Sequence, residues 1–402
     1  STQATDSNRA RIYVNGVQLT DFSTEQYVSQ NHEGSFNRAE PHQIGSHGPS
    51  SSFIDAYISE MYFVDGQSLA PTSFGETKSG VWIPKAYSGS YGTNGFHLEF
   101  AGNANDSSGN GNNFTANNIS SYDYVPDSPT LNFATLSPLS KVNSPTLSQG
   151  NLSGNFPDDN ESHSTMGVTS GKWYFEARHG GVYAMMVGVR RVTDMRYVIY
   201  ATAPSGGRQG PSYYSSNGTL NPEGTASASS YGASYGSGDI IGVAFDVDAG
   251  SITFYKNGVS QGTATSALGY DEPYLPAVCG LGPGAGNIKV NFGQDSTFAG
   301  ATTAGGNSDA NGYGDFKYAP PSGYLALCTA NLTVAEGVDP ALDASPQDYF
   351  NTVLYTSTSA SQSVSGVGIE PDWCWIKDRT SANSHHLFDQ VRGAGKRLMS
   401  NE

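Results

Sequence analysis

The feature that most constrains the fold is an Asn-Gly pair that occurs twice within the same pattern of apolar and aromatic residues. The sequence reads RIYVNGVQL at residues 11–19 and ITFYKNGVS at residues 252–260. Asn-Gly is the preferred pair for a two-residue type I′ turn, because both central residues need a positive φ. Apolar residues alternate on either side of each pair, which is typical of strands with one buried face. Each phrase therefore predicts a β-hairpin.

Composition favours β-structure with many turns and excludes two classes of partner. Gly accounts for 49 of 402 residues, and charged residues for only 14%, which is typical of turn-rich domains solubilised by neutral polar groups. The net charge is −16, and the 20 Lys and Arg are spread along the chain, so we expect no phosphate-binding surface. No apolar run reaches the about 18 residues of a spanning helix. The chain is therefore predicted to bind no nucleic acid and to insert into no membrane.

The three cysteines predict free thiols. Cys279, Cys328 and Cys374 lie far apart in apolar stretches, and none has the spacing of a zinc site. We expect all three to be buried and expect no disulfide framework.

Strand signals and a proline-dense stretch at residues 121–165 divide the chain. The strand pattern is strongest in the meander predicted for residues 240–264, and a helix start is predicted at Ser345 and Pro346. The sequence predicts an all-β fold of tandem antiparallel β-sandwiches. We expect a partial sandwich at 1–125, a complete one at 126–330 and a partial β-rich domain at 331–402, as in a piece of a longer polypeptide.

Paired carboxylates are the candidates for catalysis. Asp246 and Asp248 share one face of a predicted strand, and a glycosidase needs two carboxyl groups about 5 Å or more apart. That face lies opposite the apolar one, so we expect both groups to be solvated. The sequence contains no P-loop or H-E-x-x-H motif. We therefore expect no enzyme and no catalytic residue. Other acidic pairs and histidines with no predicted role are Asp158-Asp159, Asp271-Glu272, His32, His42, His47 and His385-His386.

One acidic loop resembles the start of a calcium site. Asp106 and Asn110 have the spacing of oxygen ligands, but Asn117 stands where such loops carry a bidentate Glu. The sequence therefore favours an ordinary Asx-turn and no cofactor, with calcium at Asp106 and Asn110 as the alternative.

A Gly-, Ser- and Tyr-rich stretch at residues 201–237 is the candidate ligand site. Tyr and Arg dominate binding hot spots, Tyr with Ser and Gly is typical of paratopes, and aromatic faces suit sugars. The alternative is that these tyrosines cover the end of the sandwich or a subunit contact. The candidate residues are Tyr213, Tyr214, Tyr231, Tyr235, Arg190 and Arg208, with Tyr197, Tyr200, Arg191 and Arg196 nearby.

The segments TMGVTSGKWYFEARH, GDIIGVAFDVDAGSITFYKNGVSQG and IKVNFG resemble a SPRY domain. The resemblance covers roughly residues 130–330 and implies a bent β-sandwich with its partner site in loops at one end. The segments RIYVNGVQLT and FIDAYISEMYFVDGQSL resemble the second half of a laminin-G/concanavalin-like sandwich.

The order of these segments along the chain is similar to that in tail-fibre and other virion appendage proteins of bacteriophages. The resemblance implies a non-enzymatic, extracellular virion component that presents loops to a host-surface glycan or protein. It also implies contacts with other virion proteins and a homo-oligomer, a trimer being expected. Two alternatives stay open, a capsid or tail decoration protein without receptor binding and a secreted bacterial lectin or glycan-active enzyme.

Overall fold

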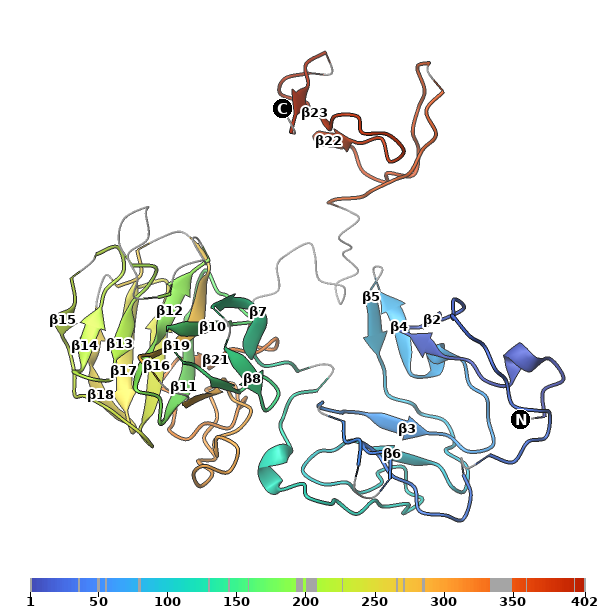
Figure 1. Ribbon diagram of the computed structural model, residues 1–402, viewed down its shortest axis with the longest axis horizontal. Coiled ribbons are helices and arrows are strands. Elements are labelled where there is room, and N and C mark those ends of the chain that lie inside the picture. Colours follow the sequence, from blue (N-terminus) through green and yellow to red (C-terminus); the bar gives the residue numbers. More distant parts are fainter. Residues whose placement is uncertain are drawn as a thin grey trace. The chain divides into compact units, whose positions relative to one another are not determined.

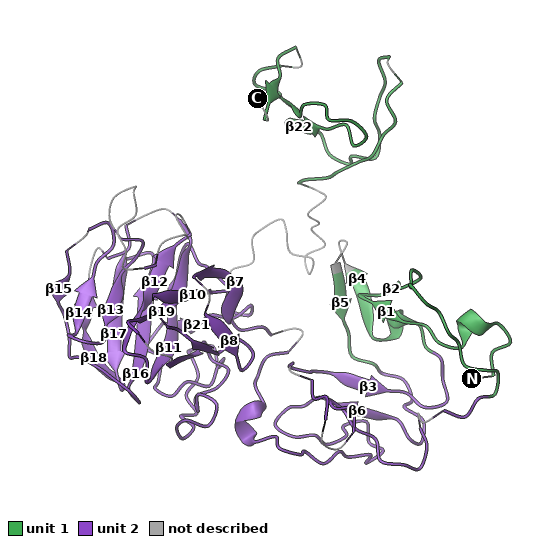
Figure 2. Ribbon diagram, viewed as in Figure 1, with its two compact units in different colours: residues 1–31, 69–87, 333–402 green, residues 32–68, 88–332 purple. Residues whose placement is uncertain are grey.

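The chain folds into antiparallel β-sheets, which confirms the predicted all-β sandwich class (Figure 1). No described helix is both long and apolar enough to cross a membrane. Figure 2 separates two compact units, residues 1–31, 69–87 and 333–402, and residues 32–68 and 88–332. This computed structural model describes residues 2–34, 37–48, 51–54, 56–78, 81–128, 131–143, 145–157, 159–192, 198–199, 208–225, 227–264, 267–269, 272–283, 286–332, 349–358, 360–393 and 395–400.

The second unit contains a sandwich of two sheets. The order of strands in the first sheet is β15-β14-β13-β12-β19-β10-β7, and every neighbouring pair is antiparallel. Its strands are β7 (Leu136–Val142), β10 (Asn160–Ser164), β12 (Ala184–Arg191), β13 (Ser212–Tyr214), β14 (Thr219–Asn221), β15 (Ser229–Ser230) and β19 (Tyr274–Leu281).

The second sheet has the order β18-β17-β16-β11-β20-β9-β8, and a short parallel strand, β21, also pairs with β11. The predicted meander is confirmed as β16, β17 and β18. The strands are β8 (Thr146–Ser148), β9 (Ser153–Asn155), β11 (Lys172–Gly180), β16 (Ile240–Asp246), β17 (Ser251–Lys256), β18 (Val259–Ala264), β20 (Asn287–Asn291) and β21 (Leu325–Ala326).

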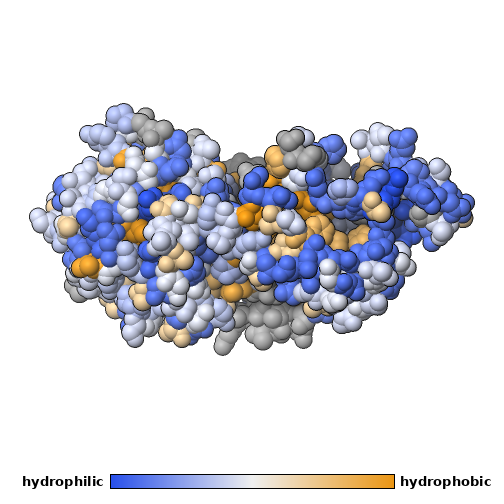
Figure 3. Space-filling model, turned by 90° about the horizontal axis from the view of Figure 1, so that it is seen from below, coloured by the Kyte–Doolittle hydropathy of each residue, from blue (hydrophilic) through white to orange (hydrophobic). Residues whose placement is uncertain are grey.

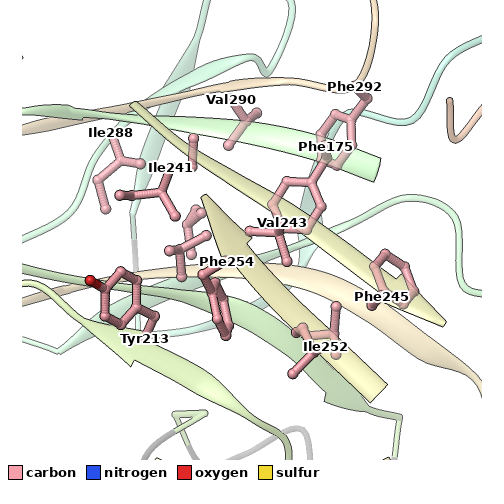
Figure 4. Packing of buried hydrophobic residues seen from close by; sticks show 14 of the residues in the cluster. Phe175, Tyr213, Ile241, Val243, Phe245, Ile252, Phe254, Ile288, Val290 and Phe292 are labelled. Carbon is pink, nitrogen blue, oxygen red and sulfur yellow. The ribbon is translucent and has the colours of Figure 1, made fainter. Parts of the chain in front are cut away.

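The core lies between these sheets and follows the alternation of each strand (Figure 4). Trp173, Phe175 and Ala177 of β11 are buried together with Val187 of β12, as side chains that alternate on the core face should be. The rings of Phe175 and Phe292 stack with centroids 5.6 Å apart. Burial of a large apolar side chain such as Phe175 contributes about 1.5–3 kcal/mol, so the packing between the two sheets holds the sandwich together.

Both predicted Asn-Gly hairpins form. Asn257 and Gly258, between β17 and β18, have φ of 49° and 80°. A β-carbon on Gly258 would lie 2.7 Å from the ring of Tyr318. The second hairpin joins β1 (Tyr13–Val14) to β2 (Val17–Gln18). Its turn glycine, Gly16, also faces an aromatic ring, since a β-carbon on it would lie 2.5 Å from the ring of Trp82. Glycine is thus required in both turns by the positive φ and by a close aromatic ring.

The two ends of the sandwich meet. Phe133 and Cys328 form an antiparallel bridge, the Thr329 N–H donates to the Asn132 carbonyl at 2.8 Å, and the Ala134 N–H donates to the Leu327 carbonyl at 2.9 Å. The chain therefore enters and leaves this domain at a single place.

Strands are short in the rest of the chain. The alternation of Ile54, Ala56 and Ile58 favours a strand, and so does the pattern at residues 353–367, but the described residues in these two stretches form none. The helix start at Ser345 and Pro346 lies outside the described residues. The elements are η1 (Asp6–Asn8), β3 (Met61–Phe63), η2 (Pro71–Ser73), β4 (Gly75–Lys78), β5 (Val81–Pro84), β6 (Phe96–Leu98), η3 (Ser121–Asp123), β22 (Trp373–Ile376), β23 (His386–Asp389) and β24 (Leu398–Met399).

Large apolar side chains are exposed mainly outside the sandwich. Val17, Phe53, Leu354 and Val391 are among the most exposed of them. On the face seen in Figure 3, apolar residues form orange patches among blue and white polar ones. The short sheets therefore bury much less apolar surface than the sandwich does.

Candidate functional site

Three of the candidate tyrosines, Tyr231, Tyr235 and Tyr213, gather with Phe254 around the ring of Tyr213. The fourth, Tyr214, packs on the other face of the first sheet, against the cluster that contains Met186. The ring centroid of Tyr213 lies 5.3 Å from that of Phe254, 4.9 Å from that of Tyr235 and 5.4 Å from that of Tyr231. Tyr213 and Tyr235 are buried in the core, and Tyr214 and Tyr231 are partly buried. The first two side chains thus have no surface to offer a ligand.

The tyrosine hydroxyl groups fasten the loop at residues 231–239 to the sandwich. The Tyr213 hydroxyl donates to the Ala233 carbonyl, and the Tyr235 hydroxyl donates to the carbonyls of Met185 and Tyr213 at 3.1 and 2.7 Å. Burial raises the pKa of Tyr213 to about 12. The hydroxyl groups are therefore neutral donors at any physiological pH, and the loop is held in one conformation.

Replacing Tyr235 by Phe should loosen this loop and leave the fold intact. The ring and its packing stay, but the carbonyls of Met185 and Tyr213 lose the one hydroxyl donor that they share, so the expected loss of stability is about 1–2 kcal/mol. Amide hydrogen exchange of residues 231–239 should become faster. The same exchange in β11 is the control, and unchanged protection of the loop would show that the hydroxyl group does not anchor it.

Four loops adjoin at one end of the sandwich and form an exposed surface, which we call the loop-end surface. It comprises residues 181–183, 231–239, 257–259 and 282–283. A β-carbon on Gly282 would lie 2.4 Å from the ring of Tyr183, which is 73% exposed. The Asn257 amide donates to the Asp239 carboxylate at 2.7 Å, so the hairpin turn is bonded to the anchored loop.

The loop-end surface combines one ion pair with exposed neutral groups. The Lys256 ammonium lies 3.2 Å from the Asp239 carboxylate. Burial alone would raise the pKa of Asp239, but hydrogen bonds from Gly236, Asn257 and Lys256 lower it. Val259 is 65% exposed. A rigid surface with two exposed apolar side chains, Tyr183 and Val259, is suited to binding a partner.

The candidate arginines lie elsewhere. Arg190 is near the other end of β12 from Tyr183, and at about 3.3 Å per residue the separation along the strand is roughly 23 Å. The Arg208 guanidinium donates to the Thr225 carbonyl at 3.3 Å, and burial lowers its pKa. The structure therefore does not bring the arginines to the tyrosines. Tyr197, Tyr200 and Arg196 lie outside the described residues.

Arg190 belongs to a buried charged cluster that sequence reasoning missed. Its guanidinium lies 2.7 Å from a Glu161 oxygen, and the same oxygen lies 2.7 Å from Nε2 of His163. The Ser140 hydroxyl lies 2.9 Å from Nδ1 of His163. Burial acts to raise the pKa of Glu161, but the hydrogen bond with His163 and the charge of Arg190 lower it.

The cluster covers part of the outer face of the first sheet. The order Ser140, His163, Glu161 resembles a hydrolase relay, but His163, Glu161 and Arg190 are fully buried. The Ile199 N–H donates to the second Glu161 oxygen at 2.5 Å. The side chains of this cluster therefore join β7, β10 and β12 to one another and to the backbone at Ile199.

The alternative calcium site is a turn held by protein groups. Asp106 accepts hydrogen bonds from the backbone N–H groups of His97, Ser108 and Asn112 at 2.9 Å each. The Asn110 amide donates to two backbone carbonyls. These contacts support the Asx-turn. Within the described ranges, no group of three or more His, Cys, Asp or Glu could hold a metal ion.

The expectation of a solvated Asp246 is wrong. Asp246 is buried, its carboxylate accepts from the Ala249 N–H at 2.9 Å, and it pairs with Lys172 at 3.3 Å. Asp246 is buried because its carboxylate accepts a hydrogen bond from the Ala249 N–H in the turn between β16 and β17. The Asp248 carboxylate accepts from the Gly171 N–H. Asp158 and Asp271, of the other acidic pairs, lie outside the described residues.

Comparison with known proteins identifies the sandwich. Residues 172–295 match the SPRY domain, and residues 345–402 match a domain of unknown function, DUF7483. The chain therefore contains a SPRY domain, as the segment around the meander predicted. No curated protein matches the chain.

Two solved structures are similar to part of the chain. The crystal structure of the SPRY domain of human HERC1 is 20% identical, has a TM-score of 0.33, and the match covers 39% of this chain and 96% of that one. The stonustoxin structure is also 20% identical, has a TM-score of 0.30, and the match covers 39% of this chain and 27% of that one.

Proposed function

We propose that this chain is a non-enzymatic structural protein of a bacteriophage virion, a tail-fibre component that recognises the host surface through its SPRY domain. The ligand is a cell-surface glycan or protein, and the recognition surface is the loop-end surface. The order of the sequence segments, which is similar to that of virion appendage proteins, is the reason for placing it in a phage.

The observation that carries the recognition part of this proposal is the anchoring of the loop at residues 231–239. Tyr213, Tyr231 and Tyr235 bond to backbone carbonyl groups and fix the loop in advance, so little conformational freedom remains to be lost on binding. The tyrosines act as supports, and the exposed groups beside them make the contacts.

Replacing Tyr183 by Ala should weaken binding of the purified chain to host cells or surface polysaccharide by about 10- to 30-fold, as loss of a hot-spot aromatic residue does. Binding can be measured by biolayer interferometry on immobilised polysaccharides and by cell pull-down. Leu139 on β7 is 93% exposed and lies outside the four loops, so Leu139→Ala is the matched control.

Two results would count against the proposal. Full binding by both Tyr183→Ala and Val259→Ser would exclude the loop-end surface as the recognition site. Failure of the unaltered chain to bind any bacterial surface would favour the decoration protein, which has structural contacts only.

A further inference from the structure

A groove lies on the side of the SPRY domain, outside the loop-end surface. Its volume is about 430 Å³, which is within the range of small-molecule sites. Tyr124 and Leu131 line it from the segment that leads into the sandwich, and Tyr313, Gly314 and Asp315 line it from the turn before Phe316.

The walls of the groove are fixed to the sandwich. The Phe133 N–H donates to the Asp127 carboxylate at 2.9 Å, and the Asp315 N–H donates to the Gly293 carbonyl at 2.8 Å. The Tyr313 N–H donates to the buried Asp309 carboxylate at 2.9 Å. These two walls are thus held by hydrogen bonds of their own backbone, and Ala101 and Gly102 also line the groove.

The groove offers aromatic rings together with polar groups that can bond to a ligand. Tyr124 and Tyr313 are only partly buried, and neither hydroxyl group has a hydrogen-bond partner in the part of the chain that the structure describes. Asp315 accepts hydrogen bonds from Ser296 and the Gly306 N–H, which leaves lone pairs for a further donor. Leu131 and Phe133 supply apolar surface between these groups.

Charge narrows the class of ligand. Among the described residues, no Lys or Arg lines the groove, and Asp315 is the one acidic residue that does. An anionic ligand would meet a carboxylate with no compensating cation. A neutral ligand could form hydrogen bonds through its hydroxyl groups with the Asp315 carboxylate and with both tyrosine hydroxyl groups. Its C–H faces would lie on the tyrosine rings.

We propose that this groove is a binding site for a neutral saccharide, one or two sugar units long. The rings of Tyr124 and Tyr313 pack against the C–H faces of the sugar, and Asp315 accepts a hydrogen bond from a sugar hydroxyl group. The inference is independent of the loop-end surface, because the two sites share no residue.

The test uses saturation-transfer NMR and calorimetry of the full chain with neutral mono- and disaccharides of glucose, galactose, mannose and N-acetylglucosamine. At least one sugar should bind. Tyr313→Phe keeps the packing of Tyr313 and should raise the Kd about threefold, and Tyr124→Ala should raise it about tenfold. Tyr183→Ala should leave sugar binding unchanged, which separates this site from the loop-end surface.

Three outcomes would overturn the inference. One is absence of saturation transfer from every neutral sugar, and another is binding that persists undiminished in a Tyr124→Ala/Tyr313→Phe variant. Tighter binding of hexuronic acids than of neutral sugars would also contradict it, because it would reverse the predicted effect of Asp315. Host-surface binding lost in Tyr183→Ala alone would support the proposed function whatever the groove does.

Discussion

Replacing Arg190 by Ala should lower the free energy of unfolding of the SPRY domain by about 3–5 kcal/mol, because it leaves a buried carboxylate without its cation. Arg190 and Glu161 are both fully buried, and their closest atoms are 2.7 Å apart. Removing the guanidinium leaves His163 as the remaining side-chain partner of Glu161. The effect should therefore far exceed that of any surface ion pair.

The measurement is a urea titration in which hydrogen exchange is followed on peptides from β11 and β16, so that only the SPRY domain is observed. Lys172→Ala is the control, because Lys172 is half exposed and its pair with Asp246 should contribute less than about 1 kcal/mol. Equal effects of the two substitutions would show that the cluster of Arg190 and Glu161 does not brace the sheet.

The SPRY domain should become less stable as the pH rises from about 4.5 to about 7, through Glu176. Burial raises the pKa of Glu176 to about 7, although hydrogen bonds from the N–H groups of Lys317 and Tyr318 and from Asn291 act to lower it. The unfolded chain releases this proton near the ordinary value of 4.5. Between these two pH values the folded state holds more protons, so stability falls as pH rises, by about 3 kcal/mol in all.

The check is a comparison of stability across pH between the unaltered chain and Glu176→Gln. Glu161, whose pKa is lowered, contributes a change of the opposite sign at lower pH, and it is present in both proteins. The difference between the two curves isolates Glu176. A difference that does not change between pH 4 and pH 8 would show that Glu176 has the same pKa in the folded and unfolded chain, and that burial does not raise it.

Within the sandwich, local patterns predicted the strands well where one face is apolar. The Asn-Gly turns and the alternation of Trp173, Phe175 and Ala177 depend on neighbouring residues only, and they lie as expected. The β10 sequence NESHS has no apolar residue, yet all five residues are buried. Its burial depends on Arg190, 29 positions further along, and no local pattern reveals such a partner.

The candidate site was harder to predict because one composition serves two purposes. A loop of Tyr, Ser and Gly suits a binding surface, but the same residues suit a loop whose tyrosines point inward and bond to backbone carbonyls. Tyr213 lies on a core-facing row beside Val187, which became visible only with the register of β12 and β13. No local pattern marks Tyr183, whose ring lies against Gly282, a residue distant along the chain.

The meeting of the two ends of the sandwich at Phe133 and Cys328 has a mechanical consequence. A pulling force along the chain would enter and leave the domain at one point, so the two sheets would carry little of it. The force would instead open the short ladder from Asn132 and Thr329 inward, one hydrogen bond at a time. The force would therefore not pass through the body of the domain, and the loops of the domain would keep their arrangement while the flanking segments are stretched.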